Sequence, residues 1–487
     1  MRFPLKTGFA LGTTVVVLAG FHRWNPEKGL SASAFKQAWS LPGIKERAST
    51  TTAESPAAAS APTQNSQTAA GATTAAQMKL DVPLAGFLYD SSGALNSFYA
   101  GLAKLEAMNG YYQVTVLHYG DSPTTADLIT GDVRSLLQAR FGDAGHGYLL
   151  VDKPWAWYGH RDTDISGHGW TIVTAVGRMK PEEYGLGGAR FEGTNGAGSH
   201  ITLHGAPQSS MDLMYLAKPG AGSVAITADD DQGKGQPVTT VDTSEEEGSA
   251  AKLVVENVPL PAHTKAVDIK VSSGKVELFG ETFLRERSGV VYDSLGLNGA
   301  STTVLSRGFD HTDWAAALQH TAPKLVIINY GTNESSFGSF VDKQYEGELR
   351  LTIQRIRNAL PNVSILVMSP MDRGERSGID QIQTMATIPR IVAIQRRVAA
   401  DTHSAFFDTF NAMGGDGTMA RWYNGNPRLV AGDLIHPTPQ GASMVAKDFV
   451  KDLLEGYNIY KSRQPAATAA PATVTQTTPQ VQGGVQR

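Results

Sequence analysis

The chain contains no cysteine. Structural disulfides, thiolate zinc sites and a cysteine nucleophile are therefore excluded. Neither sign of charge is in excess, because 42 Lys and Arg stand against 46 Asp and Glu, which gives a net charge of −4. With no stripe rich in Lys and Arg, the sequence lacks the electrostatic footprint of a nucleic-acid-binding protein, and we expect no nucleic-acid partner.

The apolar run near the N-terminus is short for a membrane span, which needs about 20 residues. Arg2 and Lys6 precede this run, which covers residues 9–21. A basic start followed by a short apolar segment is typical of a secretory signal. We interpret residues 1–30 as a signal peptide or signal anchor. This predicts export to the periplasm or surface of a bacterium, and an uncleaved leader would tether the protein to the inner membrane.

Two further segments have too few large apolar side chains to fold. Residues 31–79, above all 49–76, and residues 464–487 are dominated by Ala, Thr, Ser, Gln and Pro. Such a composition cannot offset the entropy lost on ordering. We predict a disordered linker and a disordered tail, with the folded body between them.

The folded body alternates apolar strands with amphipathic helices in its first and last parts. The apolar runs cover residues 113–118, 325–329, 365–368 and 405–407. Segments with helical periodicity follow them, and this alternation is typical of a parallel sheet covered on both faces. We therefore predict an α/β domain that is formed by two parts of the chain, residues 80–144 and 289–463.

Between residues 145 and 288 this alternation stops. Short β-like runs recur about every 10–15 residues, separated by Gly, Asp, Ser and Pro, as in β sandwiches. They cover residues 211–216, 223–227, 237–241, 253–258, 266–271 and 276–279. We predict that residues 145–288 form an all-β sandwich inserted into the α/β domain.

Three motifs carry the chemistry, and the first is Gly120-Asp121-Ser122. It lies where the strand at 113–118 meets a helix. A serine there would hold its hydroxyl clear of the sheet, at the edge where sites form in open α/β sheets. It would also lie near the positive end of the following helix. Taken alone, Gly-Asp-Ser is a common sequence, and a helix-capping serine is the favoured interpretation of Ser122.

The second motif, residues 329–333, also follows an apolar strand and ends at Asn333. The side-chain amide of Asn333 could face the same crevice and stabilise an oxyanion, although Asn is also a common turn residue. The third motif contains Asp433 and His436 in front of the final helix. The Asp433 carboxylate could hold one imidazole nitrogen while the other faces Ser122 as general base. Together the motifs predict a catalytic triad of Ser122, Asp433 and His436.

This set of motifs resembles the blocks of the SGNH (GDSL-type) hydrolase superfamily. The matching blocks are Gly120-Asp121-Ser122, Gly331-Thr332-Asn333, Asp433-Leu434-Ile435-His436 and a glycine block at 294–300. Pro123 departs from the Leu or His that is frequent in the family, which puts the subfamily in doubt.

The resemblance implies a flavodoxin-like parallel sheet and a two-step acyl transfer without cofactor or metal. It also implies an oxyanion hole made of the Ser122 and Gly299 backbone N–H groups and the Asn333 side chain. Gly296 is the alternative to Gly299.

The order of parts is similar to that of bacterial peptidoglycan O-acetylesterases with an inserted carbohydrate-binding-like module. This similarity implies removal of acetyl groups from an O-acetylated polysaccharide, with peptidoglycan first and another glycan second. Two alternatives remain open. One is a polysaccharide O-acetyltransferase that uses the same triad, and the other is a catalytically idle cell-surface glycan binder.

Two groups of side chains in the predicted insertion have alternative interpretations. Trp155 and Trp157 could stack on sugar rings or belong to the core of the domain. His200 and His204 have the i,i+4 spacing of a helical metal site. Their β-like neighbours argue against a helix, and we expect no metal site.

Overall fold

The computed structural model describes residues 82–464 except 109, 179, 231 and 379–380. The predicted leader and linker, and all but the first residue of the predicted tail, lie outside the described residues. Within the described part of the chain, no helix combines the length and apolar character needed to cross a bilayer.

A six-stranded sheet lies at the centre of the first and last parts of the chain, in the order β1-β20-β17-β16-β2-β15. Its strands are β1 (Leu88–Tyr89), β2 (Gln113–Gly120), β15 (Gly289–Gly296), β16 (Leu325–Asn329), β17 (Ser364–Met368) and β20 (Ala405–Phe407). Every pair is parallel except β1 with β20. In chain order the five parallel strands run 2-1-3-4-5, so the predicted flavodoxin-like sheet is confirmed.

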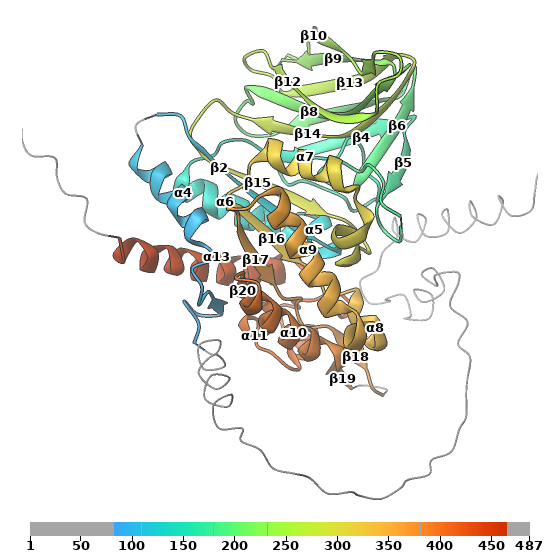
Figure 1. Cartoon of the computed structure of the whole chain (residues 1–487). Coiled ribbons are helices and arrows are strands. Elements are labelled where there is room, and N and C mark those ends of the chain that lie inside the picture. Colours follow the sequence, from blue (N-terminus) through green and yellow to red (C-terminus); the bar gives the residue numbers. More distant parts are fainter. Residues whose placement is uncertain (1–81, 109, 179, 231, 379–380, 465–487) are drawn as a thin grey trace, which may run out of the picture.

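Helices cover both faces of this sheet (Figure 1). They are α4 (Asn96–Ala107), α5 (Ser122–Thr125), α6 (Leu128–Phe141), α7 (His311–Thr321), α8 (Gly338–Lys343), α9 (Tyr345–Ala359), α10 (Thr387–Asp401), α11 (Thr409–Ala412), α12 (Thr418–Asn424) and α13 (Pro439–Ser462). A short hairpin is formed by β18 (Gly374–Arg376) and β19 (Ile382–Thr384).

The strands alternate their side chains between the two faces, as the period of two requires. In β16, Leu325 and Ile327 pack with α4, α6 and α13, whereas Val326 and Ile328 pack on the side of α7, α9 and α10. All four side chains are buried. A strand that is apolar on both faces is typical of a parallel sheet between two layers of helices.

The region between α6 and β15 contains two antiparallel sheets. One consists of β4 (Thr163–His168), β7 (Gly198–Leu203), β9 (Ser223–Asp229), β10 (Gly235–Asp242) and β13 (Ala266–Ser273). The other consists of β3 (Gly147–Leu149), β5 (Thr171–Thr174), β6 (Ala189–Thr194), β8 (Ser210–Pro219), β11 (Ser244–Glu245), β12 (Lys252–Pro259) and β14 (Lys275–Leu284), with the β11–β8 pair parallel. Side chains from both sheets share one hydrophobic cluster, as in a sandwich.

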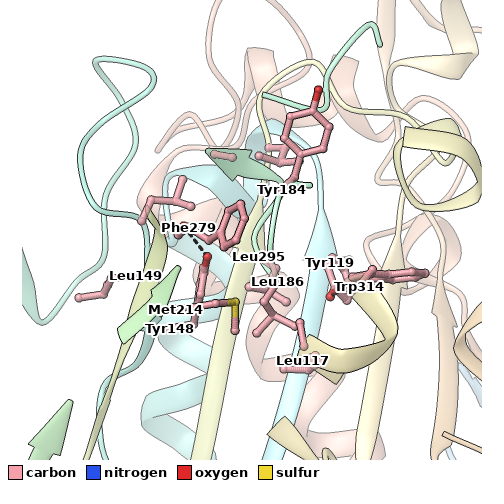
Figure 2. Packing of buried hydrophobic residues seen from close by; sticks show 14 of the residues in the cluster. Leu117, Tyr119, Tyr148, Leu149, Tyr184, Leu186, Met214, Phe279, Leu295 and Trp314 are labelled. Atoms are coloured by element: carbon pink, nitrogen blue, oxygen red, sulfur yellow. Dashed lines mark hydrogen bonds between the residues drawn. The ribbon is translucent and has the colours of Figure 1, made fainter. Parts of the chain in front are cut away.

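The core of the β-rich region is continuous with that of the hydrolase part. Figure 2 shows Leu117 and Trp314 of the hydrolase part packed in the same cluster as Tyr148, Met214 and Phe279 of the β-rich region. The Tyr148 hydroxyl donates to the Phe279 carbonyl oxygen at 2.7 Å, which satisfies this buried polar group. The insertion is therefore fixed against the sheet by shared apolar packing.

The helix after Ser122 differs from the sequence-based expectation. A single turn, α5, is followed by Asp127 in the left-handed region at φ 52°, and α6 starts at Leu128. One turn carries little of a helix dipole. The expected field from a long helix at Ser122 is therefore absent from the described structure.

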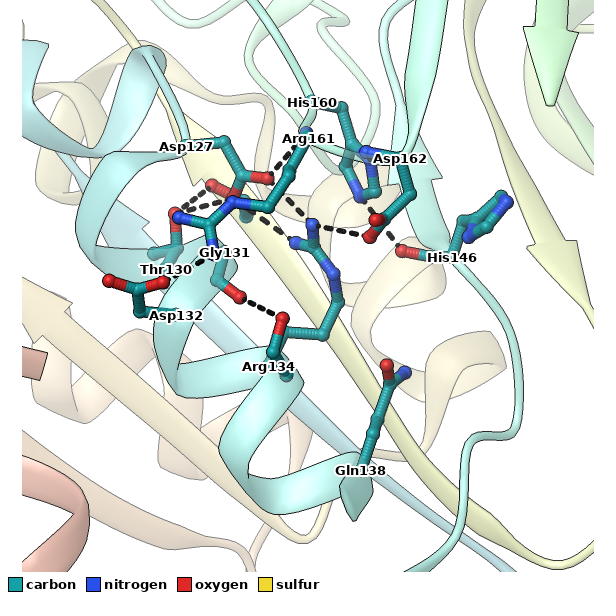
Figure 3. A network of polar contacts seen from close by, with 12 residues as sticks. Asp127, Thr130, Gly131, Asp132, Arg134, Gln138, His146, His160, Arg161 and Asp162 are labelled. Carbon is teal, nitrogen blue, oxygen red and sulfur yellow. Dashed lines mark hydrogen bonds and ion pairs between the residues drawn. The ribbon is translucent and has the colours of Figure 1, made fainter. Parts of the chain in front are cut away.

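Buried Arg134 holds Asp127 in this position (Figure 3). The Arg134 guanidinium donates to both carboxylate oxygens of Asp127, at 3.1 and 2.7 Å, and also to Asp162. The side chains of Arg134 and Asp127 are 0% and 1% exposed. Neighbouring Arg161 instead forms an ion pair with Asp132 near the surface.

We expect Arg134→Met to lower the free energy of unfolding by about 3–5 kcal/mol, because it leaves the Asp127 carboxylate buried without its cation. The matched control is Arg161→Met, which removes a surface pair and should cost about 1 kcal/mol or less. Urea denaturation of both variants tests this. Equal losses of unfolding free energy would show that the buried ion pair stabilises the fold no more than the surface pair does.

Candidate active site

The motif residues lie beyond the carboxyl ends of neighbouring parallel strands. Ser122 follows β2, Gly299 follows β15 and Asn333 follows β16. β2 lies between β15 and β16, so the three ends meet at one edge of the sheet. This is the edge at which open α/β sheets place their binding sites.

Ser122, His436 and Asp433 form one hydrogen-bonded row. The Ser122 Oγ lies 2.8 Å from His436 Nε2, and His436 Nδ1 lies 2.6 Å from Asp433 Oδ2. In the tautomer that fits both contacts, Ser122 donates to Nε2 and Nδ1–H donates to the carboxylate. The other Asp433 oxygen accepts from the backbone N–H groups of Ile435 and His436, at 3.0 and 3.1 Å. The structure thus brings the predicted triad together.

The charges of Asp433 and His436 favour His436 as a general base. Burial disfavours the imidazolium, but the hydrogen bond and charge of Asp433 outweigh burial and raise the pKa of His436 above its ordinary value. Burial alone would also raise the pKa of Asp433, but hydrogen bonds from His436 lower it. Asp433 therefore stays ionised and stabilises the imidazolium that forms when His436 takes the serine proton.

The two loops that would form the oxyanion hole are joined to each other. The Asn333 side-chain amide donates to the Ala300 carbonyl oxygen at 2.7 Å, which leaves its second N–H free of this bond. Gly299, directly before Ala300, has a φ of 77°. Within the described residues, no hydrogen bond engages the backbone N–H of Gly299 or of Ser122. These two backbone N–H groups and the second N–H of the Asn333 amide are therefore free to bind an oxyanion.

Gly296 has a different place, in β15 opposite Gly120 of β2. A Cβ atom on Gly296 would lie 2.2 Å from the backbone nitrogen of Thr125 and 2.5 Å from the carbonyl carbon of Thr124. Glycine is needed there so that β15 can approach the turn after Ser122. The geometry favours Gly299 over Gly296 as the oxyanion donor.

Two carboxyl groups near Ser122 were given no role in the sequence analysis, although Asp121 belongs to the first motif. Asp121 is 2% exposed, and burial together with the charge of Glu334 raises its pKa to about 7. Glu334 is also buried and accepts from the Gly331 N–H and from both the N–H and the hydroxyl of Thr302. Glu334 thus ties the Asn333 loop to the segment after Gly299. The feature of the sequence that could have indicated this role is the position of Glu334 directly after Asn333.

Arg373 supports the Asn333 loop from the other side. Its Nη1 donates to the Thr332 carbonyl oxygen at 2.7 Å and to the hydroxyls of Ser335 and Ser336 at 2.9 and 2.8 Å. These partners lie on both sides of Asn333 along the chain. Because Arg373 is remote in sequence from every motif, only the fold reveals this role.

The two tryptophans have different surroundings. Trp155 is partly buried against the hydrophobic core, which fits the core interpretation. Trp157 is 49% exposed, and its Nε1–H donates to the side-chain oxygen of Asn298 at 3.1 Å. The structure therefore does not join Trp155 and Trp157 into one exposed platform.

The two histidines lie on or next to strand β7, as their β-like neighbours indicated. His200 pairs with Asp268 at 2.9 Å, and His204 pairs with Asp164 at 2.8 Å. Among the described residues, His200, Asp229 and Asp268 place possible ligand atoms within 4.8 Å of one another. The helical pair of histidines that was considered in the sequence is not formed.

A serine, a histidine and a carboxylate in one row, next to free N–H groups, define a serine hydrolase. Residues 275–444 match the GDSL-like lipase/acylhydrolase family. This part of the chain is therefore a hydrolase domain of the GDSL type, which is the SGNH class of esterases. No curated protein sequence matches the chain.

Solved structures resemble the chain to different degrees. A peptidoglycan O-acetylesterase is 22% identical, with a TM-score of 0.63 over 77% of this chain and 100% of its own. This similarity shows the fold. A Bacillus subtilis protein is 12% identical, with a TM-score of 0.30 over 60% of this chain and 90% of its own. A family 29 carbohydrate-binding module is 14% identical, with a TM-score of 0.19 over 29% of this chain and 93% of its own. The last two scores are too low to support a conclusion.

We expect kcat/KM to fall as the pH drops through the pKa of His436, because only the neutral imidazole can accept the serine proton. The midpoint of this acid limb should lie above about 6.5, the ordinary histidine value. An NMR titration of His436 in Asp433→Asn should give a lower pKa than in the wild type, because the charge that raises it is gone. An unchanged pKa in the variant would contradict the assigned role of Asp433.

We expect Asn333→Ala to lower kcat by about 10²–10³ with KM nearly unchanged, because the lost donor acts on the oxyanion of the transition state. Asn333→Asp should be at least as damaging, since a carboxylate would repel the developing charge. Steady-state kinetics on a soluble acetyl ester, with circular dichroism on the same samples, tests this. A folded Asn333→Ala enzyme within a few-fold of wild-type kcat would remove Asn333 from the site.

Proposed function

We propose that the protein is an exported O-acetylesterase that removes acetyl groups from an O-acetylated polysaccharide, with peptidoglycan as the first candidate. The observation that carries the chemistry is the contact between Ser122 Oγ and His436 Nε2, with Asp433 behind it. The polysaccharide is supported by the fold similarity to a peptidoglycan O-acetylesterase. Export is supported by the basic and apolar pattern of residues 1–30.

The reaction proceeds in two steps. Ser122 Oγ attacks the acetyl carbonyl carbon while His436 Nε2 takes the hydroxyl proton, and the N–H groups of Ser122, Gly299 and Asn333 stabilise the oxyanion. The protonated His436 then gives its proton to the sugar oxygen, which leaves as a hydroxyl. In the second step His436 Nε2 takes a proton from water while the water oxygen attacks the acyl carbon. The bond between that carbon and Ser122 Oγ then breaks, His436 returns the proton to Ser122 Oγ, and acetic acid leaves and ionises to acetate.

Access of water favours hydrolysis over transfer to another sugar. The side chains of His436 and Asp433 are 35% and 41% exposed, so the triad borders solvent. A transferase would have to keep water away from the acyl-enzyme until a second sugar hydroxyl arrives.

We expect Ser122→Ala to lose about 10³-fold or more of the activity, the scale seen when a triad member is removed. The matched control is Ser135→Ala on α6, whose hydroxyl only donates to the Gly131 carbonyl oxygen and which should stay fully active. Circular dichroism checks that both variants fold.

Acetate release should be measured from O-acetylated peptidoglycan, acetylated xylan and a chromogenic acetate side by side. The proposal expects the highest kcat/KM on peptidoglycan. Preference for xylan would keep the esterase and change the polysaccharide, and an active Ser122→Ala enzyme would overturn the assignment of the nucleophile.

A further inference from the structure

A loop of the β-rich region lies against the turn that carries Ser122. This loop, which we call the Trp157 loop, covers residues 150–162 between β3 and β4. Its Gly159 N–H donates to the Thr125 carbonyl oxygen of α5 at 3.3 Å. Its Arg161 N–H donates to the buried Asp127 carboxylate at 2.9 Å. The loop is therefore fixed to the hydrolase part within a few residues of the nucleophile.

Trp157 is held between anchored neighbours. The next residue, Tyr158, is buried, and its hydroxyl accepts from the Leu150 N–H at 2.8 Å. Trp157 itself is half exposed, yet its indole N–H is directed at a side chain that is only 7% exposed, Asn298. A buried amide oxygen that loses its donor costs free energy, so this bond holds Asn298 in one orientation.

Asn298 is the residue that sets the direction of the Gly299 N–H, because that N–H belongs to the peptide unit between them. The backbone of this turn is also held by the bond from the Asn333 amide to the Ala300 carbonyl oxygen and by two bonds of its own. The Leu297 N–H donates to the Gly120 carbonyl oxygen, and the Ala300 N–H donates to the Leu297 carbonyl oxygen. Gly299 has no side chain and a positive φ, so its peptide can rotate unless Asn298 is fixed.

We propose that Trp157 is a positioning residue of the esterase site, whose indole N–H fixes Asn298 and thereby aims the Gly299 N–H at the oxyanion. This inference rests on the proposed function, since it assigns Gly299 as an oxyanion donor. A preorganised donor stabilises the transition state only if it keeps its direction. The β-rich region then contributes directly to the chemistry of the site.

Kinetics on a small chromogenic acetate separates this role from sugar binding, because such a substrate carries no sugar ring to stack. Trp157→Phe keeps an aromatic ring, and it loses the N–H donor together with the smaller ring of the indole. We expect it to lower kcat by about 10-fold to 100-fold, the cost of a slightly misplaced group, with KM unchanged. Asn298→Ala should show the same loss, and the double variant should be no worse than either single one.

The matched control is Trp170→Phe, which also removes an indole donor from the β-rich region. The Trp170 N–H bonds to Gly198 and Ser199 within that region, so this variant should keep wild-type kcat. Trp157→Phe with wild-type kcat would overturn the proposal. A general loss of stability would instead lower the melting temperature of both variants and reduce kcat in both, which would also overturn it.

A second readout does not depend on turnover. The indole N–H resonance of Trp157, assigned by its absence in Trp157→Phe, should exchange more rapidly with water in Asn298→Ala than in the wild type. An unchanged exchange rate would show that the bond to Asn298 does not exist. If the wild type hydrolyses no acetyl ester, the proposed function fails, and this resonance still tests the contact on its own.

Discussion

The contact between Ser122 and His436 is the interaction on which the site depends, and it joins residues 314 positions apart in the chain. It can form only if β2 ends at the same edge of the sheet as the loop before α13. That loop is held by its own backbone, since Ala431 N–H donates to the His436 carbonyl oxygen at 2.8 Å. Within it, Leu434 is buried at a φ of 63°. A non-glycine residue in the left-handed region stores strain, which is frequent where a side chain must be aimed at a reaction.

The β-rich region is built into the hydrolase instead of being a separate appendage. It shares one hydrophobic cluster with the central sheet, and its Trp157 loop bonds to Thr125 and Asp127 next to the nucleophile. Buried Arg134 connects the same Asp127 to Asp162 of the insertion. The position of α5, and therefore of Ser122, thus depends on contacts from both regions.

Strong local patterns in the sequence predicted much of this architecture. The runs 325–329 and 405–407 are strands with the predicted bounds, because their residues are apolar on both faces. The triad was predictable because Asp433 and His436 need only three residues of separation to meet. The roles of Gly299 and Asn333 stay predictions, although the structure places both at the edge where Ser122 lies.

Other features were hidden because they arise from tertiary contacts. The strand β15 was not predicted, and only its end was noted as part of the glycine block. Asp293 interrupts the apolar pattern of this strand. In the structure its carboxyl group is buried and accepts a hydrogen bond from the Tyr148 N–H. β4 and β7 were missed because Gly, Ser and His alternate with few apolar residues. The bond from Trp157 to Asn298 spans 141 positions, and neither residue has a pattern around it that indicates the partner.

The most direct test of the account is to trap the covalent intermediate. The protein would be mixed with a soluble acetyl ester, quenched in acid during turnover, and analysed by peptide mass spectrometry. The account predicts one acetyl group on the peptide that contains Ser122, and none on the same peptide of Ser122→Ala. Turnover with no acetylated Ser122, or with the acetyl group on another side chain, would contradict it.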